Sequence, residues 1–168
     1  EPLWTIPKSG VRFRDITPLL QNPESFRFGI DRLYQRYQNT ELDGLVALDA
    51  RGFLFGSTLA YLLGVPLIPV RKTGKLPAET VSTDYQLEYG LNSLEMHVDA
   101  LDEATRVVII DDLIATGGTM CAAVELISQL GGETIECAVI IELVDLDGRA
   151  KLSPVPLYSL VSFHEDEA

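Results

Sequence analysis

Hydrophobic residues along this chain recur either at helical spacing or in short continuous runs. Over residues 24–38 the apolar side chains fall on one face, which predicts an amphipathic helix. Residues 52–64 are apolar on nearly every face and end in Gly64, so a buried helix with a glycine stop is predicted there. A third helix is predicted from about Thr119 to Leu130.

Continuous apolar runs lie between these helices. Three of them are predicted to be buried strands: VPLIPV, RVVIID and TIECAVIIEL, at residues 65–70, 106–111 and 134–143. A shorter apolar run, LVALD at 45–49, ends in a carboxylate. Strands that are hydrophobic on both faces and alternate with helices indicate a mostly parallel sheet flanked by helices. Because 168 residues suffice for one sizeable core, we expect a single α/β domain over residues 1–168.

Residues 71–99 interrupt the alternation of strands and helices. This segment is basic at its start, polar in its middle and only weakly periodic, and so long a connection is usually functional or disordered. YQLEYG and SLEMHV alternate well enough to predict a small two-stranded flap, whereas TGKLPAETVSTD has the composition of a mobile loop. We therefore expect a flexible lid over about residues 73–98.

Charge and composition exclude several classes of partner. The net charge of -12 argues against a nucleic acid or an anionic membrane, because binding to phosphate backbones needs a basic surface. Apolar stretches fall short of the roughly 18 residues that span a bilayer, and EPLWTIPKSG lacks the features of a secretory signal. We therefore expect a cytoplasmic protein. Structural roles are expected for two free cysteines and two histidines without metal-type spacing: Cys121, Cys137, His97 and His164.

The stretch VVIIDDLIATGGTM, residues 107–120, carries the candidate chemistry. Asp111 and Asp112 end a predicted strand, where open parallel sheets bind ligands. The TGGT turn that follows leads into a helix, so unpaired backbone N–H groups and the positive end of the helix dipole face the same crevice. A phosphate fits the turn and sugar hydroxyls fit the carboxylates. The stretch therefore predicts a site for a phosphorylated ribose.

The same stretch resembles the signature with which type I phosphoribosyltransferases bind 5-phosphoribosyl-1-pyrophosphate. Four further segments, ARGFLFG, RKTGKLP, YQLEYG and GVRFRDITPLL, resemble the adenine phosphoribosyltransferase family, and the similarity covers essentially the whole chain. The resemblance implies a type I phosphoribosyltransferase fold with a small N-terminal hood, about residues 1–23, that holds the base. It also implies purine salvage: adenine and phosphoribosyl pyrophosphate give AMP and pyrophosphate, with Mg²⁺ and usually in a homodimer.

The resemblance also implies a role for each site residue. The ribose-phosphate is expected at Asp111, Asp112, Ala115, Thr116, Gly117, Gly118 and Thr119. Pyrophosphate is expected at Ala50, Arg51, Gly52, Arg71, Lys72 and Lys75, with Arg71 reaching the site of the neighbouring subunit. Adenine is expected at Arg12, Phe13, Arg14 and Leu113. The catalytic residues are expected to be Glu88, Arg51 and Lys75, and the metal is expected to be held through the substrate rather than by a dedicated protein cage.

The chemistry of the reaction agrees with these roles. Displacement of pyrophosphate from ribose C1 passes through an oxocarbenium-like state, so the site must stabilise positive charge on the sugar and negative charge on the leaving group. Asp111 and Asp112 suit the first task, and Mg²⁺ with cationic side chains suits the second. Glu88, on the expected lid, can carry the proton that adenine loses.

Two other functions remain open at this point. A regulator could bind the same phosphoribosyl ligand as a signal, and a DNA-binding extension or a basic face would favour it, but neither is visible. An enzyme of the same kind could use hypoxanthine, guanine or xanthine instead of adenine. Bases with a 6-oxo group often need a lysine beside the base, and no such pattern is visible after Glu142.

Overall fold

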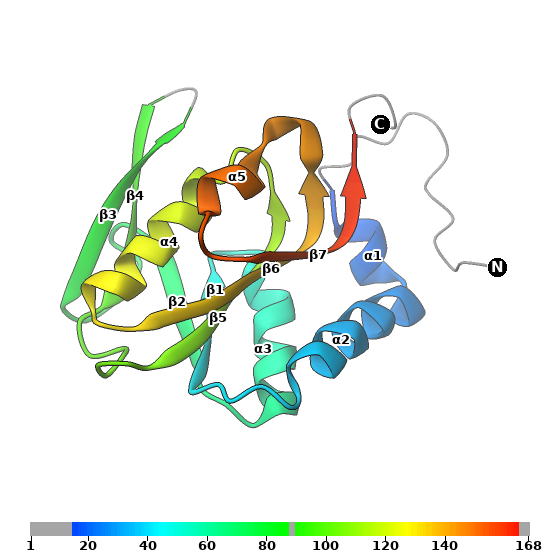
Figure 1. Ribbon diagram of the computed structural model, residues 1–168, viewed down its shortest axis with the longest axis horizontal. Helices are drawn as coiled ribbons and strands as arrows, with labels where there is room; N and C mark the ends of the chain where they lie inside the picture. The colour runs from blue at the N-terminus through cyan, green and yellow to red at the C-terminus, as the bar shows by residue number, and fades with distance from the viewer. Residues whose placement is uncertain (1–14, 88–89, 165–168) are drawn as a thin grey trace.

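A computed structural model describes residues 15–87 and 90–164, and within them the chain forms one seven-stranded sheet covered by helices (Figure 1). The strands are β1 (Gly44–Leu48), β2 (Leu67–Lys72), β3 (Thr80–Leu87), β4 (Gly90–His97), β5 (Arg106–Ile114), β6 (Glu133–Leu143) and β7 (Leu157–Phe163). The helices are α1 (Thr17–Gln21), α2 (Pro23–Tyr37), α3 (Gly52–Leu63), α4 (Gly118–Gln129) and α5 (Gly148–Leu152), with a 3-10 turn at Val144–Leu146.

The sheet is mostly parallel, as predicted. Its order is β3-β4-β2-β1-β5-β6-β7, and the five strands from β2 to β7 in this order run parallel. β4 pairs antiparallel with both β2 and β3. Because these five strands run parallel, their carboxyl ends meet along one edge of the sheet.

Two layers of helices bury the two faces of the sheet (Figure 1). Val108 and Ile110 of β5 pack in a cluster with α2 and α3, whereas Val107 and Ile109 pack in a second cluster with α4. All four side chains are fully buried. The continuous apolar run in this strand thus has a direct cause, since successive side chains point to opposite faces and both faces are covered.

The three predicted helices are confirmed, each within about one residue of its predicted ends. In α2, the side chain of Asn22 caps the helix by accepting hydrogen bonds from the backbone N–H groups of Glu24 and Ser25, both at 3.0 Å. In α3, Gly64 ends the helix in the left-handed conformation, with φ of 68°. The stop at Gly64 was therefore read correctly from the sequence, whereas the cap at Asn22 was not predicted.

Two ion-paired glutamates lie at opposite ends of β6, and the first fastens α2 to the sheet. Arg36 donates from Nε and Nη2 to Glu136 at 2.7 and 2.6 Å, and the hydroxyl of Tyr37 donates to the same carboxylate at 2.6 Å. Burial raises the pKa of Glu136, but the hydrogen bonds from Arg36 and Tyr37 outweigh it and hold this pKa below its usual value. The second pair, at Glu142, lies beside the candidate site.

The predicted two-stranded flap is present as the β3–β4 hairpin, but its first strand is longer than expected. β3 begins at Thr80, so residues 80–84, which we expected in the lid loop, belong to the sheet. The sequence did not indicate this strand because its residues are mostly polar. One face nevertheless packs on α4: Thr83 and Tyr85 are buried, and Gln129 of α4 donates to the hydroxyl of Thr83 at 2.9 Å. Flexibility of the lid stays a prediction.

Several smaller expectations also have an outcome. The structure adds α1, α5 and β7, which the sequence did not predict; β7 is a sheet edge with only partly buried residues over most of its length. Both cysteines are free thiols, Cys137 buried and Cys121 only partly buried. Across the described ranges, every helix is too short or too polar to cross a membrane.

Candidate functional site

Three loops meet at the carboxyl edge of the central strands. β1 lies between β2 and β5 and is parallel to both, so the segments that follow these strands emerge side by side. They are residues 49–52 after β1, residues 71–75 at the end of β2, and residues 111–119 at the end of β5. The sheet order therefore brings together most of the residues that were predicted to bind ribose-phosphate and pyrophosphate.

Two adjacent carboxylates occupy the end of β5. Asp112 is buried and Asp111 is partly buried, and the backbone N–H of Asp112 donates to Oδ1 of Asp111 at 2.8 Å. Burial, together with the charge of the neighbouring Asp112, raises the pKa of Asp111 well above its ordinary value. Such a crowded negative pair is costly to the folded protein, which is typical of carboxylates that serve a ligand.

Oδ2 of Asp112 is a buried acceptor with spare capacity. Nε of Arg51 lies 3.1 Å away as its ionic partner, yet this oxygen accepts no hydrogen bond of good geometry within residues 15–87 and 90–164. Buried polar atoms are normally satisfied, so an unfilled acceptor at a crevice indicates a site for a donor from outside the chain. A sugar hydroxyl or a metal-bound water can supply that donor.

The turn after β5 has a geometry that suits an anion. Ala115 and Thr116 lead to Gly117, which precedes α4 in the left-handed conformation with φ of 82°, and Gly118 and Thr119 are the first residues of that helix. The first N–H groups of a helix have no partner within it, and the dipole of this twelve-residue helix adds positive potential there. A phosphate monoester fits such a turn.

The loop after β1 carries the predicted pyrophosphate residues. Ala50 and Arg51 are exposed, and Gly52, the first residue of α3, is buried against the end of β5. The Arg51 side chain bridges from this loop to the carboxylate of Asp112. Exposed backbone next to a guanidinium is suited to a second anionic group close to the carboxylate pair.

The cationic segment after β2 lies beside this loop. Nε of Arg71 donates to Asp49 at 3.1 Å, and its Nη1 donates to the carbonyl of Lys75 at 3.3 Å. Lys72 and Lys75 are exposed. Arg71 thus holds the turn that carries Lys75. The exposed side chains of Lys72 and Lys75 can change position to contact an anion.

The other predicted residues are only partly covered by the structure. Leu113 is partly buried on β5 next to Asp112 and can offer an apolar surface to a base. Arg12, Phe13, Arg14 and Glu88 lie outside the described residues. Near Glu88, β3 does approach the site, since a Cβ at Gly118 would lie 3.6 Å from the carbonyl oxygen of Gln86.

The donor set fits a cation that arrives with its ligand. Among the described residues there is no cluster of three or more His, Cys, Asp or Glu side chains that could hold a metal ion. A Mg²⁺ ion bound to phosphate oxygens needs only one or two carboxylates from the protein. Asp111 and Asp112, with the unfilled Oδ2 atom, meet that requirement.

Two parts of the site were missed in the sequence. Asp49 is the last residue of the run LVALD, and its carboxylate accepts a hydrogen bond from Arg71. Its place directly after a predicted strand was the signal that could have marked it as a site residue. Gly148 packs against the turn at Ala115 and Gly117, although it comes from a different part of the chain. No local motif marks such a contact, because strand order alone creates it.

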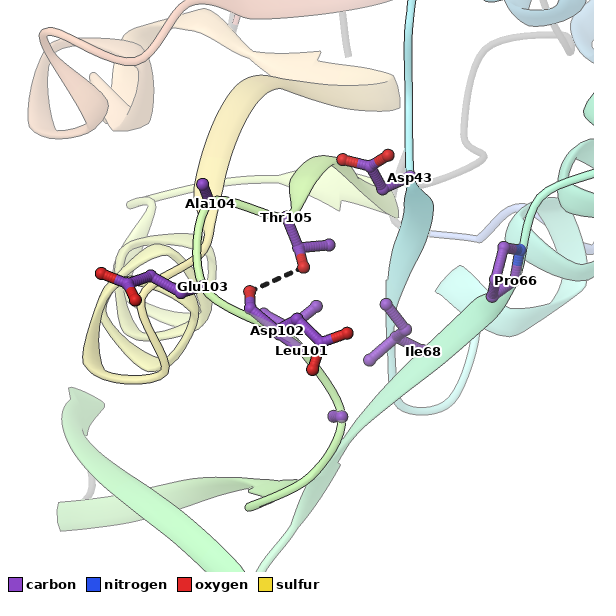
Figure 2. A pocket seen from close by; sticks show the side chains of 9 residues that line it. Asp43, Pro66, Ile68, Leu101, Asp102, Glu103, Ala104 and Thr105 are labelled. Atoms are coloured by element: carbon purple, nitrogen blue, oxygen red, sulfur yellow. Dashed lines mark hydrogen bonds between the residues drawn. The ribbon is translucent and has the colours of Figure 1, made fainter.

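A separate hollow of about 410 Å³ lies at the opposite edge of the sheet, where β1, β2 and β5 begin (Figure 2). Asp43, Asp102 and Glu103 line it, and the hydroxyl of Thr105 donates to the carbonyl of Asp102 at 2.6 Å. It contains none of the residues predicted to bind substrate, so the candidate site is the carboxyl edge.

Comparison with known proteins adds independent findings. The family model of the phosphoribosyl transferase domain matches residues 15–164. An adenine phosphoribosyltransferase of Chloroflexus aurantiacus is 52% identical over 157 residues, which cover 94% of this chain and 91% of the relative. The crystal structure of adenine phosphoribosyltransferase from Thermoanaerobacter pseudethanolicus has a TM-score of 0.87 at 50% identity, covering 94% of this chain and 91% of that one.

A third similar protein was crystallised with ligands. Adenine phosphoribosyltransferase from Saccharomyces cerevisiae, complexed with adenine and an imino-altritol bisphosphate, has a TM-score of 0.83 at 41% identity. The match covers 93% of this chain and 90% of the yeast chain.

Proposed function

This chain belongs to the adenine phosphoribosyltransferase family, with the type I phosphoribosyltransferase fold, and from that premise we propose how its residues act. The reaction transfers the 5-phosphoribosyl group of phosphoribosyl pyrophosphate to adenine and yields AMP and pyrophosphate, a step of purine salvage. The observation that carries the assignment of the site is the Asp111–Asp112 pair, of which Asp112 is buried, at the end of β5 and directly before the turn that starts α4.

The ribose-phosphate lies along β5 and α4 in this proposal. The turn from Ala115 to Thr119 binds the 5′-phosphate through its backbone N–H groups. Asp111 and Asp112 accept hydrogen bonds from the ribose hydroxyls, and their charge stabilises the positive character that develops at C1 as the bond to pyrophosphate breaks. The unfavourable crowding of the two carboxylates is relieved when the ligand supplies hydroxyl donors.

Pyrophosphate lies over the neighbouring loops. The backbone of Ala50 to Gly52 and the side chains of Arg51, Arg71, Lys72 and Lys75 bind its oxygens and disperse the negative charge of the leaving group. Asp111 and Asp112 would hold Mg²⁺ together with oxygens of the substrate, and the ion would supply further charge stabilisation. Arg51 has an additional role, because its contact with Asp112 links the sugar and pyrophosphate parts of the site.

Adenine lies between Phe13 and Leu113, with the main chain around Arg12 and Arg14 reading its edge. Glu88 accepts the ring proton as the attacking nitrogen bonds to C1, after the lid has excluded water. The position of Gln86 beside Gly118 supports this role, since Gln86 lies near the end of β3 and Glu88 comes two residues later in the sequence.

Two copies of the chain form the active enzyme in this proposal. One side of α3 exposes Leu54, Tyr61 and Leu62, and Leu67 of β2 is exposed nearby in the sequence. Exposed large apolar side chains of this kind favour a protein interface. Arg71, which follows on β2, is proposed to serve the partner's pyrophosphate as well. We place the enzyme in the cytoplasm.

The test is incubation of the purified protein with phosphoribosyl pyrophosphate, Mg²⁺ and one labelled base at a time. We expect a nucleotide product with adenine and none with guanine, hypoxanthine or xanthine. Product with a 6-oxopurine would contradict the assigned base. Binding of phosphoribosyl pyrophosphate without any nucleotide product would instead indicate a regulator.

A further inference from the structure

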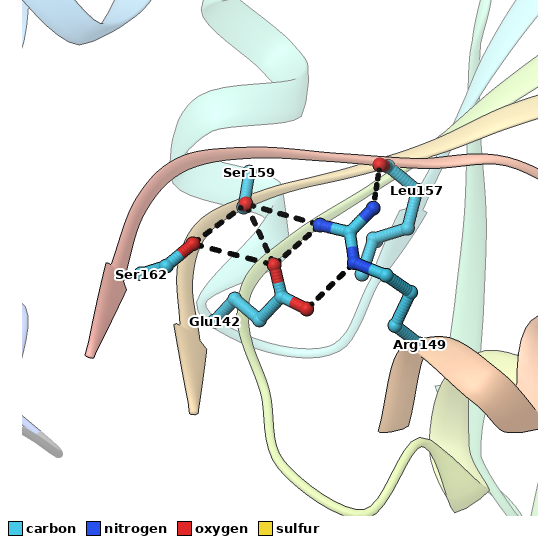
Figure 3. Close-up of polar contacts among 5 residues, drawn as sticks. All are labelled: Glu142, Arg149, Leu157, Ser159 and Ser162. Carbon is cyan, nitrogen blue, oxygen red and sulfur yellow. Dashed lines mark hydrogen bonds and ion pairs between the residues drawn. The ribbon is translucent and has the colours of Figure 1, made fainter. Parts of the chain in front are cut away.

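Arg149, the second residue of α5, is held by β6 and β7 (Figure 3). Its Nε donates to Oε1 of Glu142 at 2.8 Å, and its Nη2 donates to Oε2 of the same carboxylate. Its Nη1 donates to the carbonyl of Leu157 at 2.5 Å. The hydroxyl of Ser159 adds a hydrogen bond to Oε2 of Glu142 at 2.8 Å. One guanidinium therefore joins α5 to two strands.

This network is rigid because its carboxylate is buried. The side chain of Glu142 is 6% exposed, and the hydrogen bond from Arg149 holds the pKa of this carboxyl below its usual value, against the effect of burial. A buried ionised carboxylate that lost its partner would be strongly unfavourable. Arg149 is thus held in one position, with both oxygens of its partner engaged.

The residue before Arg149 forms the back of the phosphate turn. A Cβ at Gly148 would collide with the carbonyl oxygen of Ala115 and would lie 3.0 Å from the backbone nitrogen of Gly117. Conversely, a Cβ at Gly117 would lie 2.8 Å from the carbonyl oxygen of Gly148. The two backbones are in direct contact, so a movement of Gly148 would remove the surface against which the turn packs.

Helix α5 cannot hold that position alone. It has five residues, and an isolated helix of this length is not stable in water. Leu152 anchors its far end in the core, whereas Arg149 anchors the end next to Gly148. Glu142 itself is paired with Ile114 in the register of β5 and β6, one residue before Ala115. The ion pair therefore fixes Gly148 relative to the strand that enters the turn.

We propose that Arg149, through its two-pronged pair with Glu142, is a positioning residue that holds Gly148 against Ala115 and Gly117 and keeps the turn in its phosphate-binding shape. This inference rests on the proposed function, which assigns the 5′-phosphate to that turn. It assigns Arg149 no contact with the substrate.

Strand β6 offers a matched control at its other end. Arg36 makes the same two-pronged contact with Glu136, and the two arginine side chains are similarly exposed, at 40% and 50%. Arg36→Met and Arg149→Met should both lower the free energy of unfolding. Only Arg149→Met should change phosphate binding, since the pair at Arg36 fastens α2 and lies at the opposite end of the strand.

Titration calorimetry with AMP on the full-length protein, together with steady-state kinetics, tests the inference. We expect Arg149→Met to weaken AMP binding by about ten-fold to a hundred-fold, the range that a displacement of about 1 Å can produce. The KM for phosphoribosyl pyrophosphate should rise, while the KM for adenine stays within about two-fold. Arg149→Lys, which keeps one ion pair, should recover part of the affinity, and Arg36→Met should match the wild type.

The possible outcomes separate this inference from the proposed function. If the wild type itself fails to bind AMP, the proposed function is wrong. The positioning role is wrong if the wild type binds AMP and the two variants, Arg149→Met and Arg36→Met, change the affinity equally. It is also wrong if neither variant changes the affinity. Should Arg149→Met not fold, Glu142→Gln keeps the side-chain size and removes only the charge. It must then weaken AMP binding more than Glu136→Gln does, and equal affinities would overturn the inference.

Discussion

The backbone of Gly52 lies directly against Asp111. A Cβ at residue 52 would fall 3.1 Å from Oδ1 of Asp111 and 2.8 Å from the carbonyl oxygen of Ile110, closer than real Cβ atoms approach a carbonyl oxygen. The loop assigned to pyrophosphate therefore packs directly against the strand end that carries the carboxylates assigned to ribose. A displacement of either loop must displace the other, because there is no space between them.

Gly52→Ala is therefore a specific test of this packing contact. We expect the added methyl group to separate the two loops and to lower kcat/KM for phosphoribosyl pyrophosphate by about ten-fold or more. Gly29→Ala, in the middle of α2, is the control, since a Cβ there would make only an ordinary contact, 3.9 Å from the side chain of Leu160 on β7. That variant should keep full activity and gain roughly 0.5–1 kcal/mol in the free energy of unfolding. Wild-type kinetics in Gly52→Ala would mean that the loops are not coupled.

Asp111→Asn should exchange activity for stability. Burial and the charge of Asp112 raise the pKa of Asp111 in the folded protein, so the folded state holds this proton more tightly than the unfolded state does. The stability due to that proton is present at low pH and is lost as pH rises through the raised pKa. Asparagine removes this loss, and each kcal/mol regained raises Tm by roughly 2–4 °C.

The measurement is thermal unfolding of both proteins at about pH 5 and about pH 8, with kinetics in parallel. The variant should gain more stability at the higher pH, while turnover efficiency falls about ten-fold to a hundred-fold through loss of a charged hydrogen bond. A lower Tm than the wild type at the higher pH would contradict the crowding of the two carboxylates.

Glu88→Gln should slow the chemical step rather than substrate binding. Glutamine keeps the size of the side chain and a hydrogen bond but cannot accept the adenine proton, and general base catalysis is commonly worth about a hundred-fold to ten-thousand-fold. Rapid-quench measurement of AMP formation is the appropriate probe, since slow product release could hide the defect in steady-state turnover. A chemical rate within about two-fold of the wild type would remove Glu88 from catalysis.

Tyr37→Phe should lower stability without affecting catalysis. The hydroxyl of Tyr37 donates to the buried carboxylate of Glu136, and its loss should cost about 0.5–1.5 kcal/mol in the free energy of unfolding at neutral pH. The pKa of Glu136 is lowered in the folded protein, so its contribution is present above the ordinary glutamate pKa and is lost as pH falls through the lowered value. Urea unfolding should therefore show a smaller difference between the two proteins in acid.

The same residues explain why part of this structure could be read from the sequence. The helix over 24–38 was predicted from side-chain spacing, because a helix that buries one face needs that face to be apolar, and the helix over 52–64 was predicted from an apolar run that ends in Gly64. The aspartate pair and the glycine turn were recognised because they are adjacent along the chain and their geometry follows from local backbone structure. By contrast, β3 was predicted too short, since Thr83 is polar and is buried only because Gln129 satisfies it.

By itself, the sequence determined the α/β class and most of the core strands and helices, and it predicted one chain segment as the site for a sugar phosphate. Only the tertiary structure decided that Gly52 touches Asp111, that Asp49 holds Arg71, and that Gly148 supports the turn at Gly117. The physical reason is that these contacts join residues far apart in the chain. They depend on the order and register of parallel strands, which hydrophobic periodicity does not encode.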